Sequence, residues 1–311
     1  MFQQISQEIQ QLINHFPEQD SILFNNQPLP INQTNFQAIT PASETKSTKS
    51  LTFIDGGQAE ILSAANFCLS FIRIFAITFN NNKKTSFTKK EFYLFTKAVY
   101  QTNELYYQSK IFGDQILDKQ DLFIYSHDQT IRTGTERAPI SKIANLARRF
   151  AELSLAKTLT SDFIILDGTL TPTFPNEEKY LRQQNNISAL AKSSQLFTTS
   201  GNNPHILLNK IAPHPLWHYK LTPHTSFVKL HERAQHIFRF EGNPEVLPYL
   251  IPNSQDPLFL GYPYGLILAD KFARISNEEK NSLKIKFLIK NPEIANYLNT
   301  TNAHDILDSL G

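Results

Sequence analysis

The sequence predicts a mixed α/β domain whose sheet is partly antiparallel. Several β-rich apolar runs follow one another between residues 51 and 125. Helical patterns and short apolar runs then alternate up to about residue 192, and helical patterns dominate the C-terminal part from about Pro263. Strands first and alternation later favour a mixed sheet flanked by helices. With 311 residues, 41% of them hydrophobic, the chain is long enough to bury a sizeable core.

The first 50 residues carry one element and a polar stretch. The predicted element is an amphipathic helix over residues 3–17, because apolar residues recur there at helical spacing, namely at Ile5, Ile9, Leu12, Ile13 and Phe16. The stretch from Thr40 to Ser50 is polar and predicts a loop. We therefore divide the chain into an N-terminal helix and linker, residues 1–50, and a main domain, residues 51–311.

The first half of the main domain predicts strands. The runs are rich in β-branched and aromatic residues, and they cover Leu51–Ile54, Phe67–Phe79, Phe87–Tyr100 and Leu122–Tyr125. Phe67–Phe79 is long and fits a central strand, whereas Phe87–Tyr100 fits either a strand or a helix. The single cysteine, Cys68, lies in the central run, so we expect a buried thiol in a reducing compartment.

The second half of the main domain alternates. Pro139 and Ser141 open a helix with an apolar stripe at Ile143, Leu146, Phe150 and Leu153. The wholly apolar run Phe163–Leu166 predicts a strand covered on both faces. A polar helix around residues 176–184 then precedes a further strand at Ile187–Lys192. Two later strands are expected near Phe227–Leu230 and His236–Phe240.

The segment His214–His224, HPLWHYKLTPH, holds three histidines and the only tryptophan. It lacks the spacing of a zinc site. We interpret it as an aromatic-rich loop and strand at a partner or dimer surface.

Two acids stand in matching contexts. Asp55 follows Leu51–Ile54, Asp167 follows Phe163–Leu166, and each acid is followed by glycine. Carboxylates at the ends of neighbouring strands are suitable ligands for Mg²⁺ or Mn²⁺, and glycine beside them would let a phosphate backbone approach. Two such ions about 3.5–4 Å apart stabilise both the attacking and the leaving oxygen in phosphodiester cleavage. The alternative is that Asp-Gly is only turn chemistry.

Three more residues are candidates for the same site. Glu152 lies on the helix before the second acid, but about 100° per residue places it off the apolar stripe, so a solvated glutamate is the alternative. Lys192 is suited to offset charge on a scissile phosphate, or it is a surface lysine. His304 is suited to bind metal or carry a proton, or it is an ordinary residue of a terminal helix.

The segment Gly261–Ser276, GYPYGLILADKFARIS, carries two tyrosines beside an amphipathic helix. Tyr262 and Tyr264 are suited to stack on unpaired bases or, more commonly, to anchor the helix to the core. Asp270 and Arg274 have the i,i+4 spacing of a helical ion pair. Arg148 and Arg149 are interpreted either as phosphate contacts or as an exposed helix face.

Other function classes find no support in the sequence. No glycine is followed by lysine, so there is no phosphate loop of the G-x-x-x-x-G-K-[ST] type, and there is no G-x-S-x-G elbow of a serine hydrolase. The net charge of +2 offers no general attraction to nucleic acid. No run reaches the roughly 18 apolar residues of a membrane helix, and the start has no signal-peptide pattern, so we expect a cytoplasmic protein.

Taken together, these motifs resemble the NurA nuclease family. The resemblance rests on FIDGG at Asp55, RRFAELSLAK with Glu152, FIILDGTL at Asp167, ALAKSS with Lys192, the segment Gly261–Ser276 and the late His304. It spans residues from about 50 to the end.

The resemblance implies an RNase H-like mixed sheet with clustered acids and a DNase that depends on Mn²⁺ or Mg²⁺. Asp55, Glu152, Asp167 and His304 would then hold metal, and Lys192 would steady the substrate. It also implies 5′ to 3′ degradation of DNA, cutting within single strands, a homodimer, and a hexameric HerA-like translocase as partner in the resection of DNA ends. Residues 51–311 would form the nuclease domain.

Two other functions stay open. The first motif reads Asp-Gly-Gly where the family more usually has Asp-Gly-Ser, which leaves room for an inactive binding or scaffold module. An RNase H-like enzyme that acts on RNA is the other alternative, because no residue identifies a 2′-hydroxyl sensor.

Overall fold

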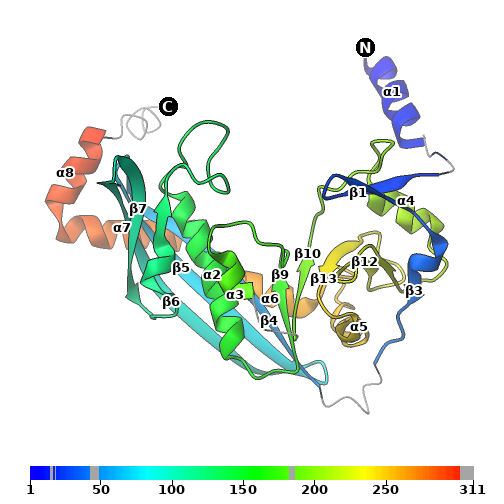
Figure 1. Cartoon of the computed structure of the whole chain (residues 1–311). Coiled ribbons are helices and arrows are strands. Elements are labelled where there is room, and N and C mark those ends of the chain that lie inside the picture. Colours follow the sequence, from blue (N-terminus) through cyan, green and yellow to red (C-terminus); the bar gives the residue numbers. More distant parts are fainter. Residues whose placement is uncertain (15–16, 18, 43–48, 182–185, 302–311) are drawn as a thin grey trace.

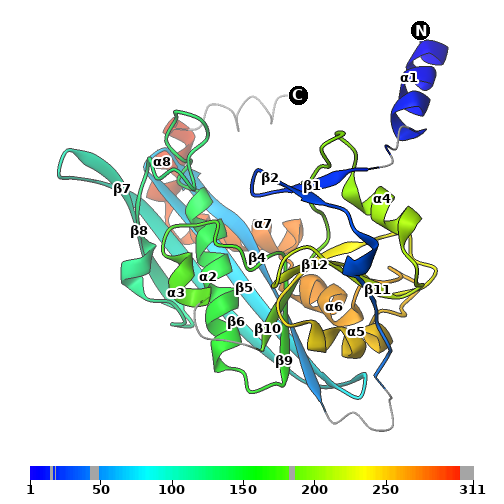
Figure 2. The ribbon, with the colours of Figure 1, turned by 45° about the vertical axis from the view of Figure 1, so that its right-hand side comes forward.

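A mixed sheet of 11 strands dominates the part of the chain that the structure describes. The structure is a computed structural model, and it describes every residue except 15, 16, 18, 43–48, 182–185 and 302–311. The strand order is β3-β11-β12-β13-β10-β9-β4-β5-β6-β7-β8. Helices α2 and α3 cover one face of the sheet, and α6 and α7 lie against the other (Figures 1 and 2).

The elements have the following bounds. The strands of the large sheet are β3 (Phe36–Ala38), β4 (Ser50–Ala64), β5 (Phe67–Asn80), β6 (Lys83–Gln101), β7 (Glu104–Gly113), β8 (Phe123–Tyr125), β9 (Phe163–Asp167), β10 (Ile187–Ala191), β11 (Trp217–Lys220), β12 (Thr225–Lys229) and β13 (Phe238–Glu241). A separate hairpin contains β1 (Ser21–Phe24) and β2 (Gln27–Pro30). The helices are α1 (Phe2–Asn14), α2 (Lys142–Thr158), α3 (Glu177–Leu181), α4 (Pro204–Ile211), α5 (Leu247–Asn253), α6 (Tyr264–Ala273), α7 (Asn277–Lys290) and α8 (Pro292–Thr301).

Strands β4 to β7 form an antiparallel meander. Tight two-residue turns with positive φ at both central residues connect β5 to β6 and β6 to β7, at Asn81–Asn82 and Thr102–Asn103. Such turns match the twist of paired strands. After the meander, α2 crosses the sheet, so β9 lies parallel to β4 and β10 lies parallel to β9. The meander and the parallel strands therefore meet at the pair β4–β9.

The central strand β9 is buried on both faces, as its apolar run predicts. Ile164 belongs to the core on the α2 side and Ile165 to the core on the α6 side, and both are fully buried. Phe150 packs in the first core and Leu266 in the second. The two cores hold α2 and α6 against opposite faces of the same pair of strands.

The predicted fold class is confirmed: a mixed sheet with flanking helices, an N-terminal helix and a helical C-terminal part. The ambiguous run Phe87–Tyr100 is a strand, and Cys68 is buried. Three expectations need correction or addition. Strand β4 does not end at Ile54, β7 was not expected, and Trp217 is fully buried in β11 rather than at a partner surface.

The N-terminal segment contributes more than a helix. Helix α1 is present and projects away from the sheet (Figures 1 and 2). Its residues Phe2, Ile5, Ile9 and Leu12 are exposed. Strand β3 pairs with β11, with Ala38 opposite Trp217, and so joins the large sheet. In the described part of the chain, no helix has both the length and the apolar character needed to cross a membrane.

Candidate active site

Asp55 and Asp167 lie on neighbouring parallel strands at equivalent positions. The last paired residues of β4 and β9 are Ile54 and Leu166, and the two aspartates follow them directly. Neighbouring strands lie about 4.8 Å apart, so the two acids start from adjacent points of the sheet. Strand β9 ends at Asp167, whereas β4 continues to Ala64. The acids therefore lie where β4 loses β9 as its neighbour, and the expectation that Asp55 ends a strand is wrong.

The Asp-Gly-Gly sequence keeps β4 extended because each glycine makes room for a helix. A Cβ atom at Gly56 would lie 2.6 Å from Oε1 of Glu152, and one at Gly57 would overlap the carbonyl oxygen of Ala273. The first contact comes from α2 and the second from α6, on opposite faces of the sheet. The interpretation that Asp-Gly forms a turn is thus wrong at Asp55. It is right after Asp167, where the strand ends and Gly168 has φ +102°.

Glu152 is buried at this junction. It is only 3% exposed, and its Oε1 accepts a hydrogen bond from Nη1 of Arg148 at 2.5 Å. The same guanidinium group donates to the carbonyl of Gly56 at 3.1 Å and lies 3.9 Å from Oδ1 of Asp55. The solvated-glutamate alternative is therefore wrong, and Arg148 links the helical acid to the first strand acid.

Arg149 holds the loop that follows Asp167. It is 8% exposed, and its Nε donates to Oε1 of Glu177 at 2.8 Å. It also donates to the carbonyl of Thr169, and its Nη1 lies 3.7 Å from Oε2 of Glu152. Arg149 is thus neither exposed nor free to contact phosphates, and it fixes the backbone beside Asp167.

Asp167 is bound by a lysine and a tyrosine. Nζ of Lys192 donates to Oδ2 of Asp167 at 2.7 Å, and the hydroxyl of Tyr262 donates to Oδ1 at 3.2 Å. Nζ of Lys192 also lies 5.4 Å from the centre of the Tyr262 ring. Tyr262 is fully buried, so it anchors the core and orients Asp167 rather than stacking on bases. The fold thus brings Lys192 and Asp167 into contact.

The surroundings of Asp55 and Lys192 raise the pKa values of both side chains. Burial, followed by the charges of Glu152 and Asp167, raises the pKa of Asp55 to about 7, although the Gly56 amide and Arg148 oppose the rise. Burial alone would lower the pKa of Lys192, but Asp167, Asp270 and Asp55 raise it. Lys192 is therefore a cation at neutral pH. A bound cation would favour the ionised form of Asp55, which burial and the charges of Glu152 and Asp167 disfavour.

The donor set suits a hard divalent cation. Asp55, Glu152 and Asp167 offer only carboxylate oxygens, which Mg²⁺ and Mn²⁺ prefer. Each of these carboxylates lies beside one of the chain's own cations. Within the described residues, no group of three or more acids, histidines or cysteines has the arrangement of a metal site. Metal would bind by replacing part of the pairing with Arg148 and Lys192. His304 lies outside the described residues.

The sequence singles out Arg148 and Tyr262, but the contacts of these two residues with the acids were not predicted. Arg148 has the i,i+4 spacing to Glu152 that is typical of a helical ion pair, so that contact could have been predicted from the sequence. The hydrogen bond from Tyr262 to Asp167 joins residues that are 95 positions apart in the sequence, so no local pattern predicts it. The predicted pair of Asp270 and Arg274 is confirmed, at 2.6 Å.

Comparisons with known proteins give similar structures but no similar sequences. No protein-family model matches the chain, and no curated protein matches it. Among solved structures, it is similar to the NurA nuclease from Sulfolobus solfataricus, with 14% identity, a TM-score of 0.46, and coverage of 82% of this chain and 86% of that one. It is also similar to Ciona intestinalis endonuclease V in complex with DNA, with 12% identity, a TM-score of 0.41, and coverage of 79% and 92%. Endonuclease V from Bacillus subtilis matches with 8% identity, a TM-score of 0.35, and coverage of 83% and 90%. A NurA nuclease, from the family that the sequence motifs resemble, is thus among the structures similar to this chain.

Proposed function

We propose that the chain is a nuclease that uses a divalent metal, Mn²⁺ or Mg²⁺, to hydrolyse phosphodiester bonds of DNA. The observation that carries this proposal is the proximity of three acids from three separate elements, Asp55, Glu152 and Asp167, at the point where β4 and β9 cease to pair. Burying mutually repelling carboxylates is costly for a fold. Such an arrangement is common where the charge serves a reaction.

Each residue has a role in this proposal. Asp55, Glu152 and Asp167 hold the metal, which when bound polarises a phosphoryl oxygen and lowers the pKa of water. Lys192, charged at neutral pH, offsets the negative charge that develops on the phosphate. Tyr262 keeps the Asp167 carboxylate in one orientation through its hydroxyl. The open space around Gly168, where a Cβ would meet no atom within 4 Å, leaves room for a backbone phosphate.

Finer features of the proposal rest on the family resemblance. They are 5′ to 3′ exonuclease action, cutting within single strands, a homodimer, and work with a hexameric HerA-like translocase in the resection of DNA ends. His304 is proposed as a further metal ligand or proton carrier. The expected cytoplasmic location and the expected nuclease domain of residues 51–311 belong to the same proposal. The lack of a phosphate loop in the sequence fits a nuclease whose motor is a separate protein.

The test is cleavage of end-labelled linear DNA with Mn²⁺, Mg²⁺ or EDTA, comparing the wild type with Asp167→Asn. We expect cleavage only with metal, and a loss of about 100-fold or more in the variant, in the range typical of removing one catalytic electrostatic group. Asp162→Asn is the matched control, because Asp162 pairs with Lys49 just before β9.

The other outcomes decide between the alternatives. Cleavage of RNA but not of DNA would show that the substrate is RNA. No cleavage of either polymer with any metal, alone or with the translocase added, would identify a binding or scaffold module and overturn the proposal.

A further inference from the structure

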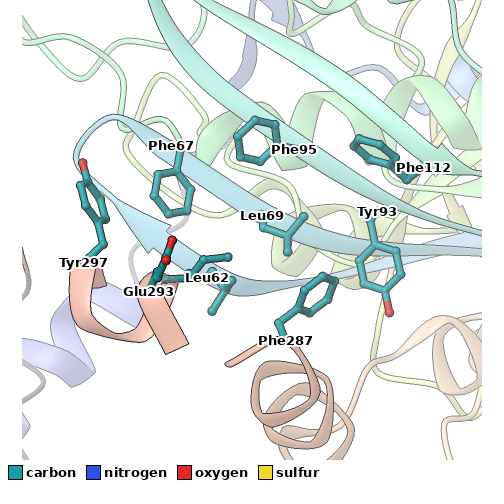
Figure 3. Close-up of a pocket in the computed structure, with 10 residues that line it drawn as sticks. Leu62, Phe67, Leu69, Tyr93, Phe95, Phe112, Phe287, Glu293 and Tyr297 are labelled. Carbon is teal, nitrogen blue, oxygen red and sulfur yellow. The ribbon is translucent and has the colours of Figure 1, made fainter. Parts of the chain in front are cut away.

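One face of the meander carries aromatic rings and lysines side by side, at the end of the sheet remote from β9. Because side chains alternate along a strand, the residues of β5, β6 and β7 that point away from α2 share this face. We call it the aromatic–lysine face, and it comprises Phe67, Tyr93, Phe95, Lys97, Lys110 and Phe112. Figure 3 shows the four aromatic rings turned toward the same space below the strands.

The space in front of this face is a cavity of about 720 Å³ between the strands and helices α7 and α8 (Figure 3). The rings of Phe67, Tyr93, Phe95 and Phe112 line it from the sheet, and Phe287 and Tyr297 line it from the helices. The Phe112 side chain is 56% exposed and Tyr297 is 45% exposed. Flat aromatic surfaces are therefore open to the solvent along the rim.

The lysines stand directly beside the rings. In the strand register, Lys97 is opposite Phe67 and Lys110 is opposite Phe95, and opposed residues on one face lie about 5 Å apart. Both lysines are exposed, and among the described residues neither forms an ion pair. The nearby Glu91 forms ion pairs with Arg73 and Lys89. Glu293 is the acidic residue among those that line the cavity.

We propose that the aromatic–lysine face binds unpaired, single-stranded nucleic acid. Bases stack on the exposed rings, and phosphates contact Lys97 and Lys110. A surface that alternates rings and free cations matches both parts of a single strand, whereas the bases of a duplex are already stacked. An acidic or purely apolar protein segment would use one part only.

This inference rests on the proposed function, and it adds a strand preference to it. The register also relates the two places. Asp55 is opposite Phe75 and Ala59 is opposite Phe71, so Asp55 and the aromatic–lysine face share one side of the sheet, whereas Glu152 comes from α2 on the other side. A single strand held on this face would thus lie on the same side of the sheet as the side chain of Asp55.

The test is the binding of fluorescein-labelled dT30 and of a 30-base-pair duplex, measured by fluorescence anisotropy in EDTA, where cleavage cannot proceed. We expect Lys97→Gln/Lys110→Gln to raise the Kd for dT30 about tenfold, and to lower the slope of log Kd against log salt by roughly 1.4, or about 0.7 per phosphate contact. Phe112→Ala should raise the Kd for dT30 about fivefold, as expected for one stacked base, with little effect on the duplex.

The matched control is Lys286→Gln/Lys290→Gln. These lysines are also exposed, lie on α7, and are not among the residues that line the cavity. Equal losses in both double variants, or unchanged binding of dT30 in all three variants, would overturn the inference. Failure of the proposed function gives a different result, namely binding of dT30 that depends on Lys97 and Lys110 without cleavage by metal.

Discussion

The guanidinium group of Arg148 lies 2.5 Å from the carboxylate of Glu152. The same group lies 3.9 Å from Asp55, so one arginine partly neutralises two of the three acids. In a protein that binds no metal, this would be a stabilising ion pair at the edge of the core. In a protein that binds Mn²⁺ or Mg²⁺, the arginine would neutralise the same carboxylates that bind the metal, so the two cations would compete.

Arg148→Gln is therefore expected to bind Mn²⁺ more tightly and to be less stable without it. Removing a unit charge about 4 Å away should strengthen binding about fivefold or more, because the repulsion reaches about 1 kcal/mol even at the dielectric constant of water. Glutamine keeps an amide donor for Glu152. The measurement is a Mn²⁺ titration followed by the electron paramagnetic resonance of free Mn²⁺, together with Tm in EDTA.

Lys49→Gln is the control for that experiment, since it removes a cation just before the start of β4 that pairs with Asp162 at 2.8 Å and not with any of the three acids. Metal affinity that stays the same or weakens in Arg148→Gln would show that the arginine is a structural support of Glu152 and not a competitor of the metal.

Asp55→Asn is expected to stabilise the protein without metal. The folded pKa of Asp55, about 7, exceeds the ordinary value of 3.8, so the folded state holds its proton more tightly than the unfolded state does. The contribution of Asp55 to the free energy of unfolding therefore falls as pH rises from about 4 to about 7. Asp55→Asn lacks this loss. The difference in free energy of unfolding between the variant and the wild type should therefore grow over the same pH range and reach ~1–3 kcal/mol above pH 7.

The measurement is urea unfolding in EDTA at pH 4, 6 and 8. Asp162→Asn provides a control of opposite sign, because hydrogen bonds from Lys49 and the Ser50 amide lower the pKa of Asp162 to about 2. That variant should be the less stable one at pH 6 and 8. An Asp55→Asn protein less stable than the wild type at pH 8 would mean that the acids do not repel one another.

Tyr262→Phe tests whether the orientation of Asp167 matters. The substitution removes one hydroxyl that donates to Oδ1 of Asp167 at 3.2 Å and leaves the buried ring in place. Loss of a bond that orients a metal ligand commonly costs about 10- to 100-fold in affinity or activity. We expect a loss of that size in Mn²⁺ affinity or in metal-dependent cleavage.

Tyr107→Phe is the matched control, because its buried hydroxyl donates to the carbonyl of Ala138 at 2.5 Å, away from the acids. Both variants should lose similar stability, and only Tyr262→Phe should lose metal binding or cleavage. Equal behaviour of the two variants would reduce Tyr262 to a core residue.

Gly57→Ala tests the contact between β4 and α6. A Cβ at this position would overlap the carbonyl oxygen of Ala273, so the end of α6 must move. Crowding a packed contact of this kind costs about 1–3 kcal/mol, and the variant should lose that much stability in urea unfolding. An unchanged unfolding midpoint would show that α6 does not approach the strand as closely as the site requires.

The strands and the pair Asp55–Asp167 were predictable because buried strands leave a local apolar pattern. What the pattern could not show is that β4 runs on past Asp55. The glycines after Asp55 have the composition of a turn, and only the helices packed against both faces explain why the strand stays extended.

Glu152 shows the same limit. Its place off the apolar stripe of α2 predicts exposure, but the missing side chain at Gly56 opens a space that the carboxylate fills. The tie from Tyr262 to Asp167, and the burial of Trp217 in β11, depend on contacts between distant parts of the chain. Such contacts leave no signal in a single sequence.

The most direct measurement of the central claim is a crystal structure with Mn²⁺, in which anomalous scattering locates the metal. We expect Mn²⁺ bound by oxygens of Asp55, Glu152 and Asp167, with the guanidinium group of Arg148 displaced from Glu152. Mn²⁺ bound elsewhere, or no Mn²⁺ at these acids while Arg148 stays on Glu152, would contradict it.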